Sequence, residues 1–183
     1  ASGIAVLTET LRAMVASGFK PEKTIKIMGY AAEEVGLRGS KAIAQSFKAS
    51  GEKVIGVAQF DMSAYKGTSN LDIVFITDYT NSAQNQFMKN LVSQYLPAMS
   101  VGESQCGYAC SDHASWNNEG YAASFAAEAR FNDSNPSIHT ANDTSFDASH
   151  SVKFAKLAVT YAAELAKGSI GGTTQPPTPP TGN

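Results

Sequence analysis

The sequence Val-Ile-Gly-Val-Ala-Gln-Phe, at residues 54–60, followed directly by Asp61, decides the fold class of this chain. Such a short, nearly continuous apolar run is typical of a β-strand that is buried on both faces. A strand of this kind belongs to a sheet that carries helices on both sides. We therefore expect further strands and helices to alternate around it.

The segments on either side supply such elements. Residues 24–31 alternate and are rich in β-branched residues, and residues 71–77 form another short apolar run, so both predict strands. Apolar residues at helical spacing predict helices over residues 4–17, 40–50, 81–96 and 149–167. The predicted fold is a three-layer α/β/α sandwich around a central mixed, mostly parallel sheet.

Composition limits the domain organisation and the partners. The 183 residues are 43% apolar and 16% charged, which suits one folded domain, expected over residues 1–167. Residues 168–183 are rich in Gly, Thr and Pro and predict a linker or tail. The net charge of −2 without a basic stripe excludes nucleic acid as the expected partner. No apolar run approaches the roughly 20 residues that cross a membrane.

Two cysteines, Cys106 and Cys110, are separated by three residues. No second pair exists to complete a zinc ribbon. A disulfide here would fix a rigid surface loop and imply an oxidising compartment. Two free, buried thiols are the alternative.

Acidic residues follow two of the predicted strands. Glu33 and Glu34 come just after residues 24–31, and Asp61 follows residues 54–60. The carboxyl ends of strands in open α/β sheets border the ligand-binding crevice, so these carboxylates should converge there. His139 lies in an irregular loop, and imidazole with carboxylates is a ligand set that suits zinc. The alternative is that these acids are ordinary loop residues.

The sequence predicts structural roles for three further residues. We expect His113 to be a half-buried helix residue, and His150 to be a solvated residue in the first turn of the last helix. Trp116 is expected in the core.

Four motifs, in this order, carry a resemblance to a known family. They are residues 30–40 (Tyr-Ala-Ala-Glu-Glu-Val-Gly-Leu-Arg-Gly-Ser), 60–62 (Phe-Asp-Met), 106–116 (Cys-Gly-Tyr-Ala-Cys-Ser-Asp-His-Ala-Ser-Trp) and 135–140 (Asn-Pro-Ser-Ile-His-Thr). Together they resemble the secreted bacterial leucyl aminopeptidases of the co-catalytic di-zinc peptidase family, over residues 1 to about 167.

The resemblance implies a role for each matching residue. Glu33 corresponds to the general acid/base, Glu34 and His139 to ligands of one zinc ion, and Asp61 to a ligand of the other. Tyr108, in the Cys106–Cys110 loop, corresponds to a hydrogen-bond donor to the substrate. Four residues correspond to the wall of an apolar pocket for a leucine-like first residue: Met62, Cys110, Phe131 and Ile138. At Ala127 the family usually has an aromatic residue.

The resemblance further implies a secreted, monomeric zinc enzyme that acts on peptides with a free N-terminus. In the family, an aspartate that bridges both zinc ions and a histidine ligand precede the position of Ala1. The chain is therefore expected to be an N-terminally truncated, C-terminal portion of the catalytic domain, with its own N-terminal segment as a partner. The alternative is a catalytically incompetent fragment or interaction module. A metal-free binding domain is disfavoured, because the four site residues are retained.

Overall fold

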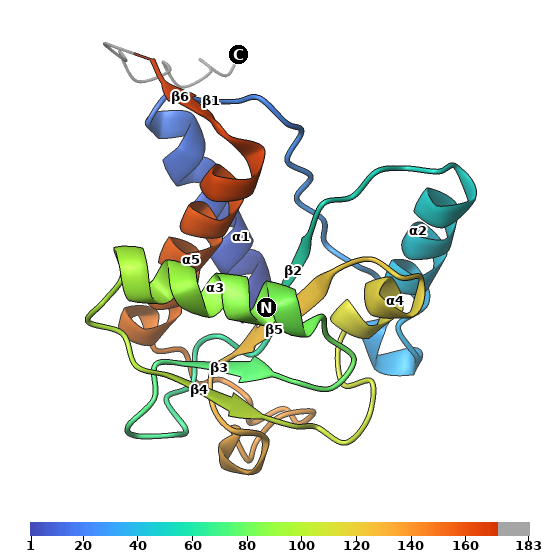
Figure 1. The fold of residues 1–183 in the computed structure, drawn as a ribbon. Coiled ribbons are helices and arrows are strands. Elements are labelled where there is room, and N and C mark those ends of the chain that lie inside the picture. The colour runs from blue at the N-terminus through green and yellow to red at the C-terminus, as the bar shows by residue number, and fades with distance from the viewer. Residues whose placement is uncertain (172–183) are drawn as a thin grey trace, which may run out of the picture.

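The structure of this chain, a computed structural model, describes residues 1–171 (Figure 1). The rest of the predicted tail, residues 172–183, lies outside the described residues. The helices are α1 (Ser2–Ala16), α2 (Arg38–Ala49), α3 (Ser82–Tyr95), α4 (His113–Asn118) and α5 (Ala148–Ala166), with short 3-10 turns η1 (Glu33–Val35) and η2 (Phe131–Asp133). The strands are β1 (Phe19–Pro21), β2 (Val57–Phe60), β3 (Ile73–Ile76), β4 (Val101–Ser104), β5 (Ala123–Ala127) and β6 (Gly168–Ile170).

The main sheet has the strand order β2-β5-β3-β4. β2 pairs with β5 and β3 pairs with β4 in parallel, whereas β3 and β5 are antiparallel. The predicted mixed, mostly parallel sheet is thus confirmed. β1 and β6 form a separate antiparallel ribbon, in which residues 168–170 pair with residues 19–21.

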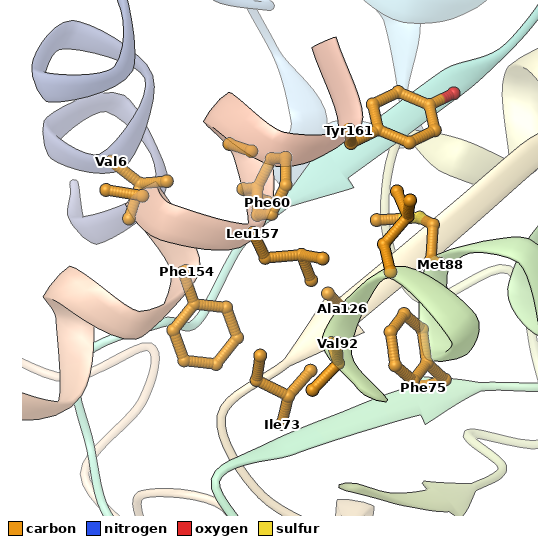
Figure 2. Close-up of a cluster of buried hydrophobic side chains, with 13 residues drawn as sticks. Val6, Phe60, Ile73, Phe75, Met88, Val92, Ala126, Phe154, Leu157 and Tyr161 are labelled. Atoms are coloured by element: carbon orange, nitrogen blue, oxygen red, sulfur yellow. The ribbon is translucent and has the colours of Figure 1, made fainter. Parts of the chain in front are cut away.

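Helices cover both faces of this sheet, which confirms the predicted three layers. α1, α3 and α5 pack on one face, and α2 and α4 lie on the other (Figure 1). Figure 2 shows the larger core cluster, in which Phe154 and Leu157 of α5 meet side chains from α1, α3 and the strands. Within residues 1–171, no helix combines the length and hydropathy needed to cross a membrane.

The second face is built around Trp116 of α4, which is buried as predicted. Its ring packs edge-to-face against Phe47 of α2, with ring centroids 5.3 Å apart. Its indole Nε1–H donates a 2.8 Å hydrogen bond to the Tyr30 hydroxyl. This contact fixes the end of the chain segment that leads into Glu33 and Glu34.

The predicted strand at residues 24–31 is wrong. The segment is extended, but within the described chain no backbone hydrogen bond joins residues 24–30 to another segment. Alternation and β-branched residues give a segment the capacity to pair, whereas a strand also requires a neighbouring edge. The described chain places no strand beside it.

Two strands of the main sheet were missed. β5 (Ala-Ser-Phe-Ala-Ala) and β4 (Val-Gly-Glu-Ser) contain mostly small or polar residues, which have low β-propensity. β5 nevertheless lies between β2 and β3 and is buried throughout, because small side chains fit between the helices that cover it.

The predicted environments of two histidines need correction. His150 is 1% exposed instead of solvated, because the first turn of α5 packs against the chain after β5, where its Nε2 lies 3.2 Å from the Glu128 carbonyl oxygen. His113 is fully buried instead of half-buried, because its ring packs on Phe125 of β5. Burial lowers the pKa of His113 to about 4, and it also lowers the pKa of His150.

Removing side-chain volume from the core cluster should destabilise the chain. We expect Leu157→Ala to lower the free energy of unfolding by about 2–5 kcal/mol, because Leu157 is fully buried and a cavity would remain. Leu11→Ala is the matched control, since Leu11 is 50% exposed and its loss should cost less than about 0.5 kcal/mol. Urea unfolding followed by circular dichroism measures both; equal losses would contradict the described core.

Candidate active site

One pocket, with a volume of about 910 Å³, lies where β2 and β5 end. It collects every site residue predicted from the sequence, although they are spread over more than a hundred positions. These lining residues are Glu33, Glu34, Asp61, Met62, Cys106, Tyr108, Cys110, Phe131, Ile138 and His139. Ala127 and Ala1 also line this pocket.

Glu34 and His139 form a pair in the lining of this pocket. The Nε2 atom of His139 lies 3.2 Å from a carboxylate oxygen of Glu34. Both side chains are about two-thirds exposed, at 65% and 70%. Glu34 comes from η1, and His139 comes from the loop before α5, so the tertiary fold alone brings them together.

Asp61 is held in a fixed orientation at the end of β2. One carboxylate oxygen accepts a 2.8 Å hydrogen bond from the Met62 backbone N–H. The other accepts a 2.9 Å hydrogen bond from the Ser111 hydroxyl, which in turn accepts one from the Gln59 amide at 3.2 Å. This chain of donors leaves the Asp61 carboxylate little freedom to rotate.

The backbone is strained beside each of these acids. Ala32 precedes Glu33, Met62 follows Asp61, and both have positive φ angles, of 58° and 48°. His139 itself has φ 63°. Such conformations cost of order 1–3 kcal/mol for residues other than glycine and cluster at functional sites. Here they turn the chain sharply so that the site side chains enter the pocket.

Glu33 lies at the centre of the negative charge. Burial, followed by repulsion from Asp61, Asp112 and Glu34, raises the pKa of Glu33 to about 7. The positive potential of His139 opposes this shift. A carboxyl group with this pKa can both accept and release a proton near neutral pH, which general acid/base catalysis requires.

The Cys106–Cys110 disulfide is formed, with an S–S distance of 2.08 Å, so the alternative of free thiols is wrong. The Asp78 carboxylate fixes the loop by accepting hydrogen bonds from the backbone N–H groups of Cys106 and Gly107, at 3.2 and 2.6 Å. Tyr108 stands 53% exposed beside the pocket, edge-to-face with Phe131. The loop therefore holds Tyr108 in the lining of the pocket.

Sequence reasoning missed several supporting residues. Asp78 follows the predicted strand at residues 71–77, so the rule that found Asp61 could also have found it. Glu128 follows β5 and accepts hydrogen bonds from the Ala64 and Tyr65 backbone N–H groups, at 2.7 and 2.8 Å. It was missed because β5 was not predicted. Ser111 carries no sequence signal for its contact with Asp61.

The donor atoms suit zinc in type but are incomplete in number. Carboxylate oxygen and imidazole nitrogen are usual zinc ligands, and catalytic zinc normally has three protein ligands. Within residues 1–171, no group of three or more His, Cys, Asp or Glu side chains is placed to hold a metal ion. The pocket thus provides a pair of donors at Glu34 and His139 and a separate one at Asp61.

Comparison with known proteins places the site in context. The chain is 38% identical over 174 residues to a probable leucine aminopeptidase of Arthroderma benhamiae, covering 92% of this chain and 47% of the relative. It is 39% identical to the LapA aminopeptidase of Legionella pneumophila, with a TM-score of 0.85, covering 90% of this chain and 45% of that one. A zinc aminopeptidase of Bacillus subtilis shares the fold at 18% identity and a TM-score of 0.74, covering 91% of this chain and 41% of that one.

The chain spans about half the length of these relatives. The sequence signature of peptidase family M28 matches residues 1–162, which include every site residue described above. This chain is therefore a member of peptidase family M28.

Proposed function

We propose that this chain is the C-terminal catalytic portion of a zinc aminopeptidase that removes an apolar, leucine-like residue from the N-terminus of peptides. The observation that carries the proposal is the position of Glu33. Its carboxyl group, with a pKa of about 7, lines one pocket together with Asp61 and the Glu34–His139 pair. Membership of a peptidase family and the leucine aminopeptidase relatives support the same reaction class.

In the proposed reaction, Glu33 is the general base and then the general acid. As a carboxylate it accepts a proton from the attacking water, and as a carboxylic acid it returns that proton to the leaving amine. Glu34, His139 and Asp61 are the residues that would hold zinc, together with ligands from outside this chain. Zinc, when bound, supplies Lewis acidity. Tyr108 lines the same pocket, and its hydroxyl would donate a hydrogen bond to the substrate.

The pocket wall supports the proposed preference for an apolar first residue. Met62, Phe131 and Ile138 line one continuous cavity with Ala127. Apolar side chains in one part of a pocket favour an apolar side chain of the substrate there. The small Ala127 side chain leaves room for a branched residue.

The disulfide supports a proposal about location. Disulfides persist in oxidising compartments, so we propose that the parent protein is secreted.

The incomplete donor set favours a second candidate: alone, this chain is a catalytically incompetent fragment. Zinc content and release of leucine from a chromogenic leucine amide separate the two candidates. The first expects stoichiometric zinc and turnover in the parent protein. Less than one zinc ion per isolated chain, without turnover, would favour the second.

Glu33→Gln in the parent protein should reduce kcat by about 10²–10⁴-fold, because the amide cannot accept a proton. Zinc content should not change, since Glu33 is not one of the proposed ligands. Glu22→Gln is the matched control, because Glu22 is exposed next to β1 and outside the pocket. Steady-state kinetics with metal analysis checks both variants, and unchanged turnover in Glu33→Gln would exclude the assigned role.

The raised pKa of Glu33 should also make the stability of the folded chain depend on pH. In the window from pH 4.5 to 7, folded Glu33 keeps a proton that the unfolded chain releases, so its stabilising contribution is lost as pH rises through 7. Gln resembles the protonated form. Glu33→Gln should therefore match the wild-type chain at pH 4.5 and exceed its Tm at pH 8.

Because Glu33 is partly solvated, we expect a gain of only about 1 kcal/mol, which is roughly 2–4 °C in Tm. Differential scanning calorimetry in EDTA measures the Tm of Glu33→Gln and of the wild-type chain. A Tm difference that does not change with pH would contradict the shifted pKa.

A further inference from the structure

Two aspartates, one before and one after β3, bind the chain on either side of β4. β3 and β4 lie side by side and run parallel (Figure 1). Asp72 precedes β3, and its carboxylate accepts hydrogen bonds from the Ser100 N–H and hydroxyl, at 2.8 and 3.0 Å, just before β4. Asp78 follows β3, and its carboxylate accepts hydrogen bonds from the N–H groups of Cys106 and Gly107, just after β4. The two carboxylates therefore do similar work at opposite ends of this strand pair.

Only the end with Asp78 belongs to the active-site pocket. Cys106 and Tyr108 are among the described residues that line this pocket, whereas Asp72 and Ser100 are not. A change at Asp72 thus affects the strand pair alone, and a change at Asp78 affects the strand pair and the pocket.

The turn that carries Asp78 is rigid. Asn85 of α3 is 4% exposed, and its amide donates hydrogen bonds to the Ile76 carbonyl oxygen and the Thr80 hydroxyl, at 2.8 and 3.0 Å. Tyr79, directly after Asp78, has a φ angle of 54°. Residues other than glycine keep such a conformation only where their surroundings impose it. Asp78 therefore stands on a fixed support between β3 and α3.

The disulfide does not by itself set where the loop stands on the sheet. It joins Cys106 to Cys110, which are four positions apart, so it limits the internal shape of this loop. The hydrogen bonds to Asp78 instead join the start of the loop to the chain after β3. Bonds to an ionised acceptor are about twice as strong as those between neutral groups. Tyr108 comes directly after Gly107, so its position depends on these bonds.

We propose that Asp78 is a positioning residue for the aminopeptidase reaction, and that it acts through Tyr108. By binding the Gly107 N–H, its carboxylate places the next residue so that the Tyr108 hydroxyl meets the substrate. Asp78 is absent from the described residues that line the pocket, so it does this without touching the substrate. The inference rests on the proposed function, because it requires the hydrogen bond from Tyr108 to the substrate.

A double-mutant cycle in the parent protein tests the coupling, with kcat/KM for a chromogenic leucine amide as the readout. Asparagine has one side-chain oxygen instead of two, so Asp78→Asn leaves one loop N–H without its acceptor. We expect Asp78→Asn and Tyr108→Phe each to lower kcat/KM by about tenfold. The double variant should also lose about tenfold, instead of about a hundredfold, because the second change removes an interaction that is already lost.

Asp72→Asn is the matched control. It makes the same substitution at the other end of β3 and removes an acceptor from the Ser100 N–H. Its kcat/KM should stay within about twofold of the wild-type value, and combining it with Tyr108→Phe should give additive effects. A general loosening of β4 would instead lower kcat/KM in both aspartate variants. Circular dichroism at the assay temperature checks that all variants are folded.

Amide hydrogen exchange in the metal-free chain supplies a readout that does not require activity. Asp78→Asn should speed exchange at residues 106–108 by at least about tenfold, because these N–H groups lose their acceptor, and Asp72→Asn should not change it. Faster exchange in an inactive parent protein would contradict only the proposed function.

Three results would overturn the inference while leaving the aminopeptidase activity in place. They are unchanged kcat/KM in Asp78→Asn, additive effects of Asp78→Asn and Tyr108→Phe, and unchanged exchange at residues 106–108. Unchanged kcat/KM in Tyr108→Phe would overturn both the inference and the role assigned to Tyr108.

Discussion

The parallel pairing of β2 with β5 is the constraint on which the rest of the site depends. Its register places Phe60 beside Ala126, so both strands run toward the same end of the sheet. Asp61 and Glu128 both line the pocket at that end, and the loops from η1 and from residues 134–147 bring Glu34 and His139 to it. Helices on both faces keep the pairing in place, because residues of β2 and β5 contribute to the core on either side.

This arrangement concentrates negative charge, and the charge explains the chemistry. Asp61 is held by hydrogen bonds from the Met62 N–H and the Ser111 hydroxyl, so its carboxylate has little freedom to rotate. Burial and the surrounding carboxylates hold the Glu33 proton until about pH 7. Strained backbone at Ala32, Met62 and His139 maintains these positions, so part of the stability of the fold is used to gather groups that would otherwise repel each other.

Much of the fold and site could be predicted, because periodicity and the ends of strands are local signals. The run at residues 54–60 and the helix at residues 149–167 correspond to β2 and α5. β5 could not be predicted, because its small residues become a strand only between β2 and β3. The strand prediction at residues 24–31 was wrong for the opposite reason. These residues have strand-forming side chains, but the described chain gives them no neighbouring strand to pair with. The contact of Ser111 with Asp61 also depends on tertiary structure alone.

The central claim is that this pocket makes Glu33 a proton acceptor near neutral pH. The most direct test is the side-chain carboxyl ¹³C chemical shift of Glu33, followed by NMR from pH 3 to 9 in the metal-free chain and assigned with Glu33→Gln. A midpoint near pH 7 is expected, from burial and the neighbouring carboxylates. A midpoint near 4.5, the ordinary value for glutamate, would contradict the claim.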